Sequence, residues 1–513
     1  MKTVCSIGAF VQALATQSQA SHGFDLASSG RAAEAELIRI TVAVDPREEL
    51  FEIVRQIDQL TEFPPVIVFD DVRGSQFPVV VNLLATEQRC AQMLGVPHWN
   101  DISQLFPFSR SINSEAKGFL WSTATEPIIR QRTVASQQVI RLGGEVDLGT
   151  LPGIYRQTQS PHPVLFHAHS VTRGTGGDRS VDRCHLSILD GKTLICDWPL
   201  GSAAPRHLEE ARAAGQPLPV AFVIGSDTAS YAMDGRWLNL HPACWGRDVW
   251  EFLGRQRESG FVVARARTSD IDVAGDAEMI LEGVIDTGVV NVPHHLETRR
   301  SGWQSEVAEF PLARITAITH KALPLVPMVL PETRESHLAD RLLEQVSRSR
   351  LSSIIPELNE LYFPALQEGH QLIVASLKSS DVGRARQLIH AIWSLPILSE
   401  AKLVIIVDND VDIRDQSAVW RAIVREAGFP EDIEYSRGTG VPWSKPPSSV
   451  EFLSRQNPGM PLIFSGQKIG IDATRKKRVS DSDDQLSRAT IEKVKARWDE
   501  YGLSEYLRTP GLL

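Results

Sequence analysis

Residues 163–173 read "PVLFHAHSVTR", an apolar, β-branched run that ends in the glycine-rich segment "RGTGGD" (173–178). A run of this kind, closed by turn residues, predicts a β-strand followed by a hairpin. The glycines could also hold a phosphate, but no helix pattern follows at once, so we favour the hairpin. The pattern recurs in "RCHLSIL" (183–189), "LPVAFVIG" (218–225), "FVVARART" (261–268), "AEMILEGVID" (277–286) and "ARITAITHK" (313–321). Short strands joined by such turns predict a β-barrel or sandwich.

The residues before this strand-rich region predict an α/β arrangement. "ELIRITVAV" (36–44) alternates as an edge strand does, and "PPVIVFDDV" (64–72) has the short apolar run of a buried strand. Between them, we expect Asp45 as a helix N-cap and Pro46 as the first helical residue. Gly95 is the expected C-cap of a later helix.

The last third of the chain returns to the same alternation. Residues 370–378 and 401–413 read as buried strands, and residues 381–395 read as a helix between them, which is a βαβ-like order. We therefore expect four parts: an N-terminal α/β region (1–114), the β-barrel (115–325), a C-terminal α/β domain (326–478), and a hinge with an oligomerisation helix (479–513).

The tail carries an apolar stripe at helical spacing, formed by Ile491, Val494, Trp498 and Tyr501. A helix with such a stripe needs a partner surface, often another subunit. We therefore expect a homodimer or a higher homo-oligomer.

The composition is ordinary for a soluble globular protein, with 42% hydrophobic and 23% charged residues in a chain of 513. The formal net charge of -10 disfavours nucleic acid or an anionic membrane as a partner. The five cysteines include no CxxC pair, which favours a reducing, cytoplasmic location over a disulfide framework. No apolar stretch reaches transmembrane length.

Seven segments in order resemble the UbiD family of reversible non-oxidative decarboxylases, over about residues 36 to 478. They are "VAVDPREELFEIVRQI", "VIVFDDVRGSQFPVVVNLLATEQRCAQMLG", "GDAEMILEG", "ITAITHKALPLVP", "GRARQLIHAIW", "VIIVDNDVDI" and "GQKIGIDATRKK". The resemblance implies a central split β-barrel like those that bind flavin, flanked by two α/β parts. It also implies a carbon–carbon lyase that uses prenylated FMN, whose phosphate is held through Mn²⁺ with K⁺ nearby, on an unsaturated or aromatic carboxylic acid.

The family's functional positions are occupied by other residue types in this chain. In the family, an Asn begins a strand and the catalytic Arg lies five residues later. The ungapped counterparts are Ser180 and His185, and the metal-binding His and Glu fall at Asp197 and Val262. The segment that contacts the flavin phosphate falls at Asp234, Gly235 and Arg236.

The family's active-site loop, which carries two catalytic acids, falls at "VPHHLETRRSGW" (292–303). Glu297 is the only carboxylate of this loop, and Arg299 or Arg300 falls near the second acid. His294 and His295 precede it, and because histidines titrate near neutrality, they would be auxiliary proton donors in a rebuilt decarboxylase site.

Three interpretations stay open. The first is a decarboxylase with a rebuilt site, in which Glu297 is the acid and His185 or Arg299 orients the substrate carboxylate. The second is a cofactor-free or non-catalytic relative that serves as a binding or scaffold subunit. The third is a different metal site, in which Asp197, His185 and the 294–297 cluster converge on a divalent ion. Each residue also has a structural interpretation, since His185 fits a core histidine, Asp197 fits a turn and "HHLETRR" fits a solvated charged loop.

Overall fold

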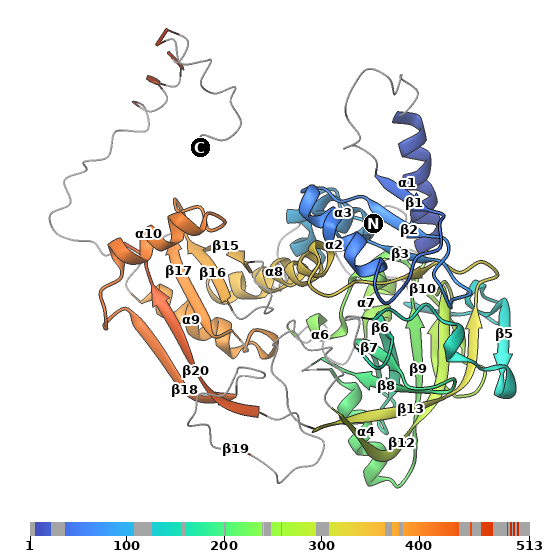
Figure 1. The fold of residues 1–513 in the computed structure, drawn as a ribbon. Helices are drawn as coiled ribbons and strands as arrows, with labels where there is room; N and C mark the ends of the chain where they lie inside the picture. The colour runs from blue at the N-terminus through green and yellow to red at the C-terminus, as the bar shows by residue number, and fades with distance from the viewer. Residues whose placement is uncertain are drawn as a thin grey trace. The chain divides into compact units, whose positions relative to one another are not determined.

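We analysed a computed structural model of the chain, which describes residues 6–21, 36–106, 126–155, 160–199, 202–238, 240, 248–257, 259–293, 307–364, 372–378, 383–399, 401–440, 452–453, 463–475 and seven positions from 490 to 501. The chain divides into two compact units, Met1–Thr474 and Arg475–Leu513. Three sheets of four or more strands lie in the first unit (Figure 1).

The central region forms a closed six-stranded β-barrel, as the sequence predicts. Its order is β12-β9-β6-β7-β8-β13, and the pairing of β12 with β13 closes it, while β5 extends the sheet beyond β13. The bounds are β5 Val139–Leu142, β6 Val164–Arg173, β7 Arg179–Ile188, β8 Thr193–Asp197, β9 Leu218–Ile224, β12 Met279–Pro293 and β13 Val307–His320.

The two faces of β6 and β7 belong to two different apolar cores. Ala168 and Cys184 lie in one core, and Val171 and Val181 lie in the other. The register of β6 shifts between Leu165 and Ala168, where His167 adopts a positive φ of 65°. Because a bulge re-aims the side chains around it, it is common near functional sites.

Short helices and a small sheet cover the barrel. The helices are α4 (Ala204–Ala213), α5 (Thr228–Ala232), α6 (Gly235–Leu238) and α7 (Val249–Gln256). The sheet consists of β11 (Asp272–Ala274), β10 (Phe261–Arg265) and β4 (Ile128–Arg130). Four short 3₁₀ turns lie here, η3 to η5 within Ala135–Thr150 and η2 at Trp99–Leu105.

The N-terminal part is α/β, with β1 at the edge of a four-stranded sheet of order β1-β2-β3-β14. Its elements are α1 (Ile7–Ser21), β1 (Leu37–Ile40), α2 (Leu50–Leu60), β2 (Val66–Phe69), β3 (Val79–Val81), α3 (Glu87–Leu94) and β14 (Val326–Pro327). Gly95 caps α3 with a φ of 72°, as predicted.

The predicted start of α2 is wrong. The helix begins at Leu50 with Glu49 as its N-cap. The Asp45 carboxylate instead accepts the main-chain N–H of Arg47 at 2.7 Å, which closes a local turn before the helix. An Asx turn of this kind competes with helix capping, and both use the same residue types.

The C-terminal α/β part has a sheet of order β15-β16-β17-β20-β18, with β16 and β17 parallel as the βαβ pattern predicts. Its elements are α8 (Arg334–Ile354), β15 (Leu358–Tyr362), β16 (Leu372–Leu377), α9 (Arg384–Ser394), η7 (Pro396–Leu398), β17 (Leu403–Asp408), α10 (Gln416–Glu426), β18 (Ile433–Gly440), β19 (Phe452–Leu453) and β20 (Ile463–Asp472).

Little of the second unit is described. Val494 and Tyr501 of the predicted stripe are partly exposed, whereas Ile491 and Trp498 lie outside the described residues. Oligomerisation through this segment therefore stays a prediction. Among the helices that the structure describes, none combines the length and the apolar character of a membrane span.

Candidate active site

The predicted cofactor residues meet where β7 and α6 pack together. Gly235 lies so close to β7 that a Cβ there would stand 2.4 Å from the main-chain oxygen of Val181 and 3.0 Å from a carboxylate oxygen of Asp182. Ser180 lies at the start of the same strand, and its hydroxyl donates a hydrogen bond to Asp182. The structure thus brings Ser180 and the Asp234–Arg236 segment into one cluster.

Asp182 is buried in this cluster and occupies the N-terminus of α4. Its Oδ2 accepts the main-chain N–H groups of Ala203 at 2.8 Å and Ala204 at 3.1 Å. Burial raises the pKa of Asp182, and the nearby Asp234 adds to the increase, although these hydrogen bonds oppose it. The helix N-terminus, which favours anions, is therefore filled by a carboxyl group of the chain itself.

Asp234 and Arg236 form a tight ion pair inside the cluster. The Asp234 side chain is fully buried, and Arg236 Nη2 lies 2.7 Å from its Oδ2. Burial alone would raise the pKa of Asp234, but the positive charges of Arg236 and Arg183 outweigh it and lower the pKa to about 2. The carboxylate therefore stays ionised at neutral pH.

Arg183 is a functional candidate that the sequence comparison missed. It is only 8% exposed, and Nη2 donates a hydrogen bond to the Ala232 carbonyl at 3.4 Å. Its Nε is buried without a partner among the described residues. A buried, nearly unpartnered guanidinium is costly, and such groups are typical of anion-binding sites. The signal in the sequence was an arginine two residues before His185, on the same predicted strand.

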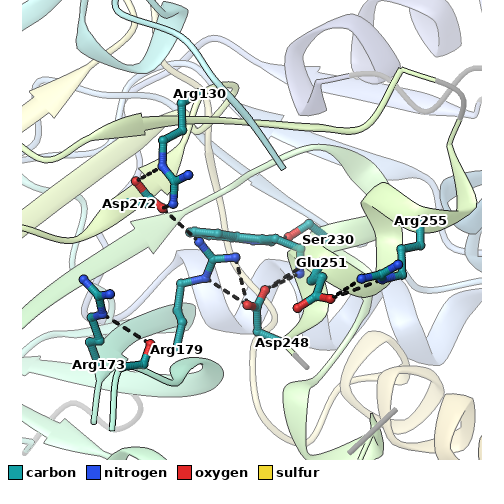
Figure 2. A network of polar contacts seen from close by, with 10 residues as sticks. Arg130, Arg173, Arg179, Ser230, Asp248, Glu251, Arg255 and Asp272 are labelled. Atoms are coloured by element: carbon teal, nitrogen blue, oxygen red, sulfur yellow. Dashed lines mark hydrogen bonds and ion pairs between the residues drawn. The ribbon is translucent and has the colours of Figure 1, made fainter. Parts of the chain in front are cut away.

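A network of arginines and carboxylates fixes the start of β7 beside this cluster, as Figure 2 shows. Arg179 contacts Asp248 at 2.8 Å and Asp272 at 3.2 Å, and its guanidinium lies 5.2 Å from the Trp250 ring. Asp248 also caps α7 by accepting the Trp250 and Glu251 N–H groups at 2.8 and 3.1 Å. Burial raises the pKa of Asp248, against the lowering effect of Arg179. The network ties β7, α7 and the small sheet together.

Figure 2 also shows how this network continues outward. Arg130 pairs with Asp272 through two hydrogen bonds of 3.1 and 2.7 Å, and Arg255 pairs with Glu251 at 2.8 Å. Arg173 donates to the Gly177 carbonyl within the hairpin turn at 3.2 Å. The N–H and hydroxyl of Thr175 donate to Glu210 at 3.0 and 3.1 Å. The glycine-rich turn is thus a hairpin held by a carboxylate.

His185 and Asp197 lie directly opposite each other on β7 and β8. Directly opposed Cβ atoms in an antiparallel pair are about 5 Å apart, so the two side chains are neighbours. His185 Nδ1 accepts the His167 main-chain N–H at 3.3 Å, which leaves Nε2 of a neutral His185 ring as its N–H donor. Ser180 lies five residues earlier on the strand, about 17 Å away at the usual rise.

The remaining predicted site residues lie outside the described residues. They are His294, His295, Glu297, Arg299 and Arg300. Whether Glu297 approaches His185, and whether the 294–297 cluster completes a metal site, therefore stays a prediction. Among the described residues, no three His, Cys, Asp or Glu side chains are grouped as metal ligands would be.

The described part of the cluster does not fit a flavin phosphate held through a metal ion. Ser180 is bonded to Asp182, the α4 N-terminus is filled by Asp182, and Arg236 is bound to Asp234. Val262, which the sequence comparison aligns with the family's glutamate, has no ligand atom. Both buried carboxyl groups are already bound within the chain, and no three possible metal ligands are grouped among the described residues.

Comparisons with known proteins agree with this architecture. Three domains of 3-octaprenyl-4-hydroxybenzoate carboxy-lyase match the chain: the N-terminal domain over residues 31–107, the Rift-related domain over 128–333 and the C-terminal domain over 336–473. These matches cover most of the chain, which therefore belongs to the UbiD family.

Individual relatives cover nearly the whole chain at low identity. "Uncharacterized protein sll0936" of Synechocystis sp. is 27% identical over 92% of this chain and 94% of its own. Vanillic acid decarboxylase of Sedimentibacter hydroxybenzoicus, in its closed form, is 18% identical, with a TM-score of 0.74 over 99% of this chain and 100% of its own. The UbiD-class enzyme HmfF of Pelotomaculum thermopropionicum, solved with FMN, is 19% identical, with a TM-score of 0.70 over 95% and 99% of the two chains. The two solved structures share the fold.

Proposed function

We propose that this protein is a carboxy-lyase that removes the carboxyl group from an unsaturated or aromatic carboxylic acid, at a site rebuilt relative to its family. Membership of the UbiD family supports the reaction class. The observation that carries the proposal is Arg183, a buried guanidinium beside Asp234 whose Nε has no hydrogen-bond partner among the described residues. An arginine in this state binds a carboxylate, because its planar N–H groups match the two oxygens.

In this reaction the bond between the carboxylate and the carbon breaks, CO₂ leaves, and a proton takes its place. Arg183, assisted by His185 or Arg299, binds and orients the carboxylate. Glu297 is the proposed acid that returns the proton, with Arg300 near it and His294 and His295 as auxiliary donors. The Trp237 ring, 5.7 Å from the Arg183 guanidinium carbon, offers an apolar surface to the body of the acid.

We further propose that the site does not hold prenylated FMN through a metal, because Asp182 and Asp234 occupy the donors near Ser180 and Arg236. Asp197 would then orient His185 rather than bind a metal ion. The same occupied donors also favour a second candidate function, in which the chain is a cofactor-free binding or scaffold subunit. A homo-oligomer formed through the tail is part of either proposal.

Native mass spectrometry and a visible absorption spectrum, taken on protein co-expressed with a flavin prenyltransferase, test the cofactor proposal. We expect a colourless protein whose mass is a whole multiple of the mass of the chain, with no added flavin mass. A bound flavin mass would overturn that part and leave the lyase proposal standing.

Decarboxylation of vanillic, 3,4-dihydroxybenzoic and cinnamic acids, followed as CO₂ release, tests the reaction. We expect turnover of at least one acid, and a loss of about 100-fold in kcat/KM for Arg183→Lys, since a bidentate contact is lost. Arg173→Lys, an exposed arginine on the neighbouring strand, is the matched control and should change kcat/KM little. Absence of turnover and of ¹³C-bicarbonate exchange, with and without added flavin, would reject the lyase and favour the binding subunit.

A further inference from the structure

Three consecutive main-chain carbonyls at the end of α5 are each bound by a basic side chain of the barrel. We call these side chains, His167, His169 and Arg183, the α5 clamp. The contacts are His167 Nε2 to Tyr231 O at 2.9 Å, Arg183 Nη2 to Ala232 O at 3.4 Å, and His169 Nε2 to Met233 O at 3.0 Å.

The clamp supplies hydrogen-bond donors to the carbonyl groups at the end of α5. The last carbonyls of a helix have no partner within it and must find donors elsewhere. The Met233 N–H is already used by the carbonyls of Ala229 and Ser230. The barrel supplies the next three donors because His169 and Arg183 are opposite in register and the bulge at His167 re-aims its side chain.

The contacts also fix the chemistry of the two histidines. A carbonyl only accepts, so Nε2 of each ring carries the proton. Burial and the charge of Arg183 together lower the pKa of His169 to about 4 and that of His167 well below its usual value. Each ring is thus a neutral Nε2–H donor, fully buried against the barrel.

We propose that His167 and His169 are positioning residues, which hold the end of α5 so that Asp234, Gly235 and Arg236 lie against β7 beside Arg183. Asp234 follows the clamped carbonyls directly, and its own carbonyl accepts the Trp237 N–H at 3.0 Å, so the clamp is continuous with α6. The close approach of Gly235 to Val181 needs this placement, because the gap would not hold a Cβ. That this segment serves catalysis rests on the proposed function; that it is clamped does not.

Hydrogen–deuterium exchange of the peptide covering residues 234–238 tests the proposal in two variants. His169→Leu removes the donor, whereas His169→Gln keeps an amide N–H close to the place of Nε2. We expect exchange about tenfold faster in the leucine variant and close to wild type in the glutamine variant. His207→Leu is the matched control. It also loses a buried histidine, but one bonded to Thr172 at 2.8 Å and Asp178 at 3.1 Å.

Equal exchange in His169→Leu and wild type, or exchange in His169→Gln as fast as in His169→Leu, would overturn the positioning role. If His169→Leu does not fold, long-range ¹H–¹⁵N spectra of the wild-type imidazoles decide the matter, since an Nδ1–H tautomer, which has no Nε2–H to donate, would contradict the clamp. Neither readout uses turnover. If these experiments detect the clamp but the protein decarboxylates none of the acids, the positioning role stands and the proposed function is rejected.

Discussion

Two fully buried carboxyl groups of this protein have pKa values that are shifted in opposite directions. Asp234, in the barrel cluster, has a pKa lowered to about 2. Glu335, in the first turn of α8, has a pKa raised to about 8. Both side chains are withdrawn from water, so burial alone does not decide whether a carboxyl group is charged.

The difference lies in the partners. Burial pushes the pKa of Asp234 up, but Arg236 and Arg183 place two positive charges near it and prevail. Glu335 accepts the main-chain N–H groups of Asn82 at 2.6 Å and Leu84 at 2.9 Å. These dipoles and the charge of Arg89 lower its pKa less than burial raises it. A full opposite charge in contact offsets desolvation, whereas two amide dipoles do not.

The comparison distinguishes a carboxylate of the candidate active site from a carboxyl group that connects two structural elements. The Asp234 pair keeps charge in the cluster between β7 and α6, where a carboxylate substrate is proposed to bind. Glu335 joins α8 to the loop after β3 and carries its proton at neutral pH.

The largest expected effect follows from breaking the charged pair. Arg236→Met leaves the Asp234 carboxylate buried with only the more distant Arg183, so we expect the free energy of unfolding to fall by about 3 kcal/mol. Urea denaturation measures it. Arg39→Met is the matched control, since Arg39 pairs with Asp70 at 3.0 Å but its side chain is 56% exposed; its loss should stay within about 0.5 kcal/mol. Similar losses in both variants would show that Asp234 is not held by its charge partner.

The second prediction concerns Glu335. Glu335→Gln keeps one acceptor oxygen but places the amide N–H₂ group against a buried main-chain N–H, so that two donors face each other. We therefore expect the free energy of unfolding to fall by about 2 kcal/mol near pH 5.5. The folded pKa of Glu335 lies above the unfolded value of 4.5, so its contribution is present at low pH and is lost as the pH rises towards 8. The difference in unfolding free energy between wild type and variant, measured by urea denaturation, should therefore narrow from about pH 5.5 to about pH 8. A gap that widens would show that Glu335 is ionised in the folded state.

Much of the fold follows from local patterns in the sequence. The β-branched runs between turn residues predict the barrel strands, and Gly95 predicts its own C-cap because a helix end needs a left-handed residue. The start of α2 was missed because an aspartate before a proline serves an Asx turn and a helix cap equally well, and only the N–H of Arg47 shows which.

The candidate site was less predictable, because its members come together only through the closed sheet. Ser180, Asp234, Gly235 and Arg236 converge as the resemblance implies. Arg183 was overlooked because an ungapped comparison favoured His185, and the burial of its side chain cannot be seen in one sequence. The fates of Glu297 and its neighbours depend on a loop outside the described residues.

A third prediction concerns His169, whose contribution to stability changes with pH in the opposite direction to that of Glu335. His169 has a folded pKa of about 4, below the unfolded value of 6.5. The unfolded chain therefore takes up a proton first, and stability is lost as the pH falls through this window. Relative to His169→Gln, the wild type should lose about 1 kcal/mol of unfolding free energy between about pH 6.5 and pH 5. A wild-type loss that matches the variant's would mean that the pKa of His169 is the same in the folded and the unfolded chain.

The smallest expected effect concerns Asn82, in the turn whose N–H groups bind Glu335. Asn82 is buried with a φ of 66°, and its side-chain amide donates to the Pro65 carbonyl at 3.2 Å. Asn82→Gly loses that bond but adopts the left-handed conformation freely, whereas Asn82→Ala loses the bond and keeps the strain. The glycine variant should therefore be more stable than the alanine variant by about 1 kcal/mol in urea denaturation. If alanine were the better substitute, the turn would have moved away from the left-handed region, and the two N–H groups that hold Glu335 would no longer point at its carboxyl group.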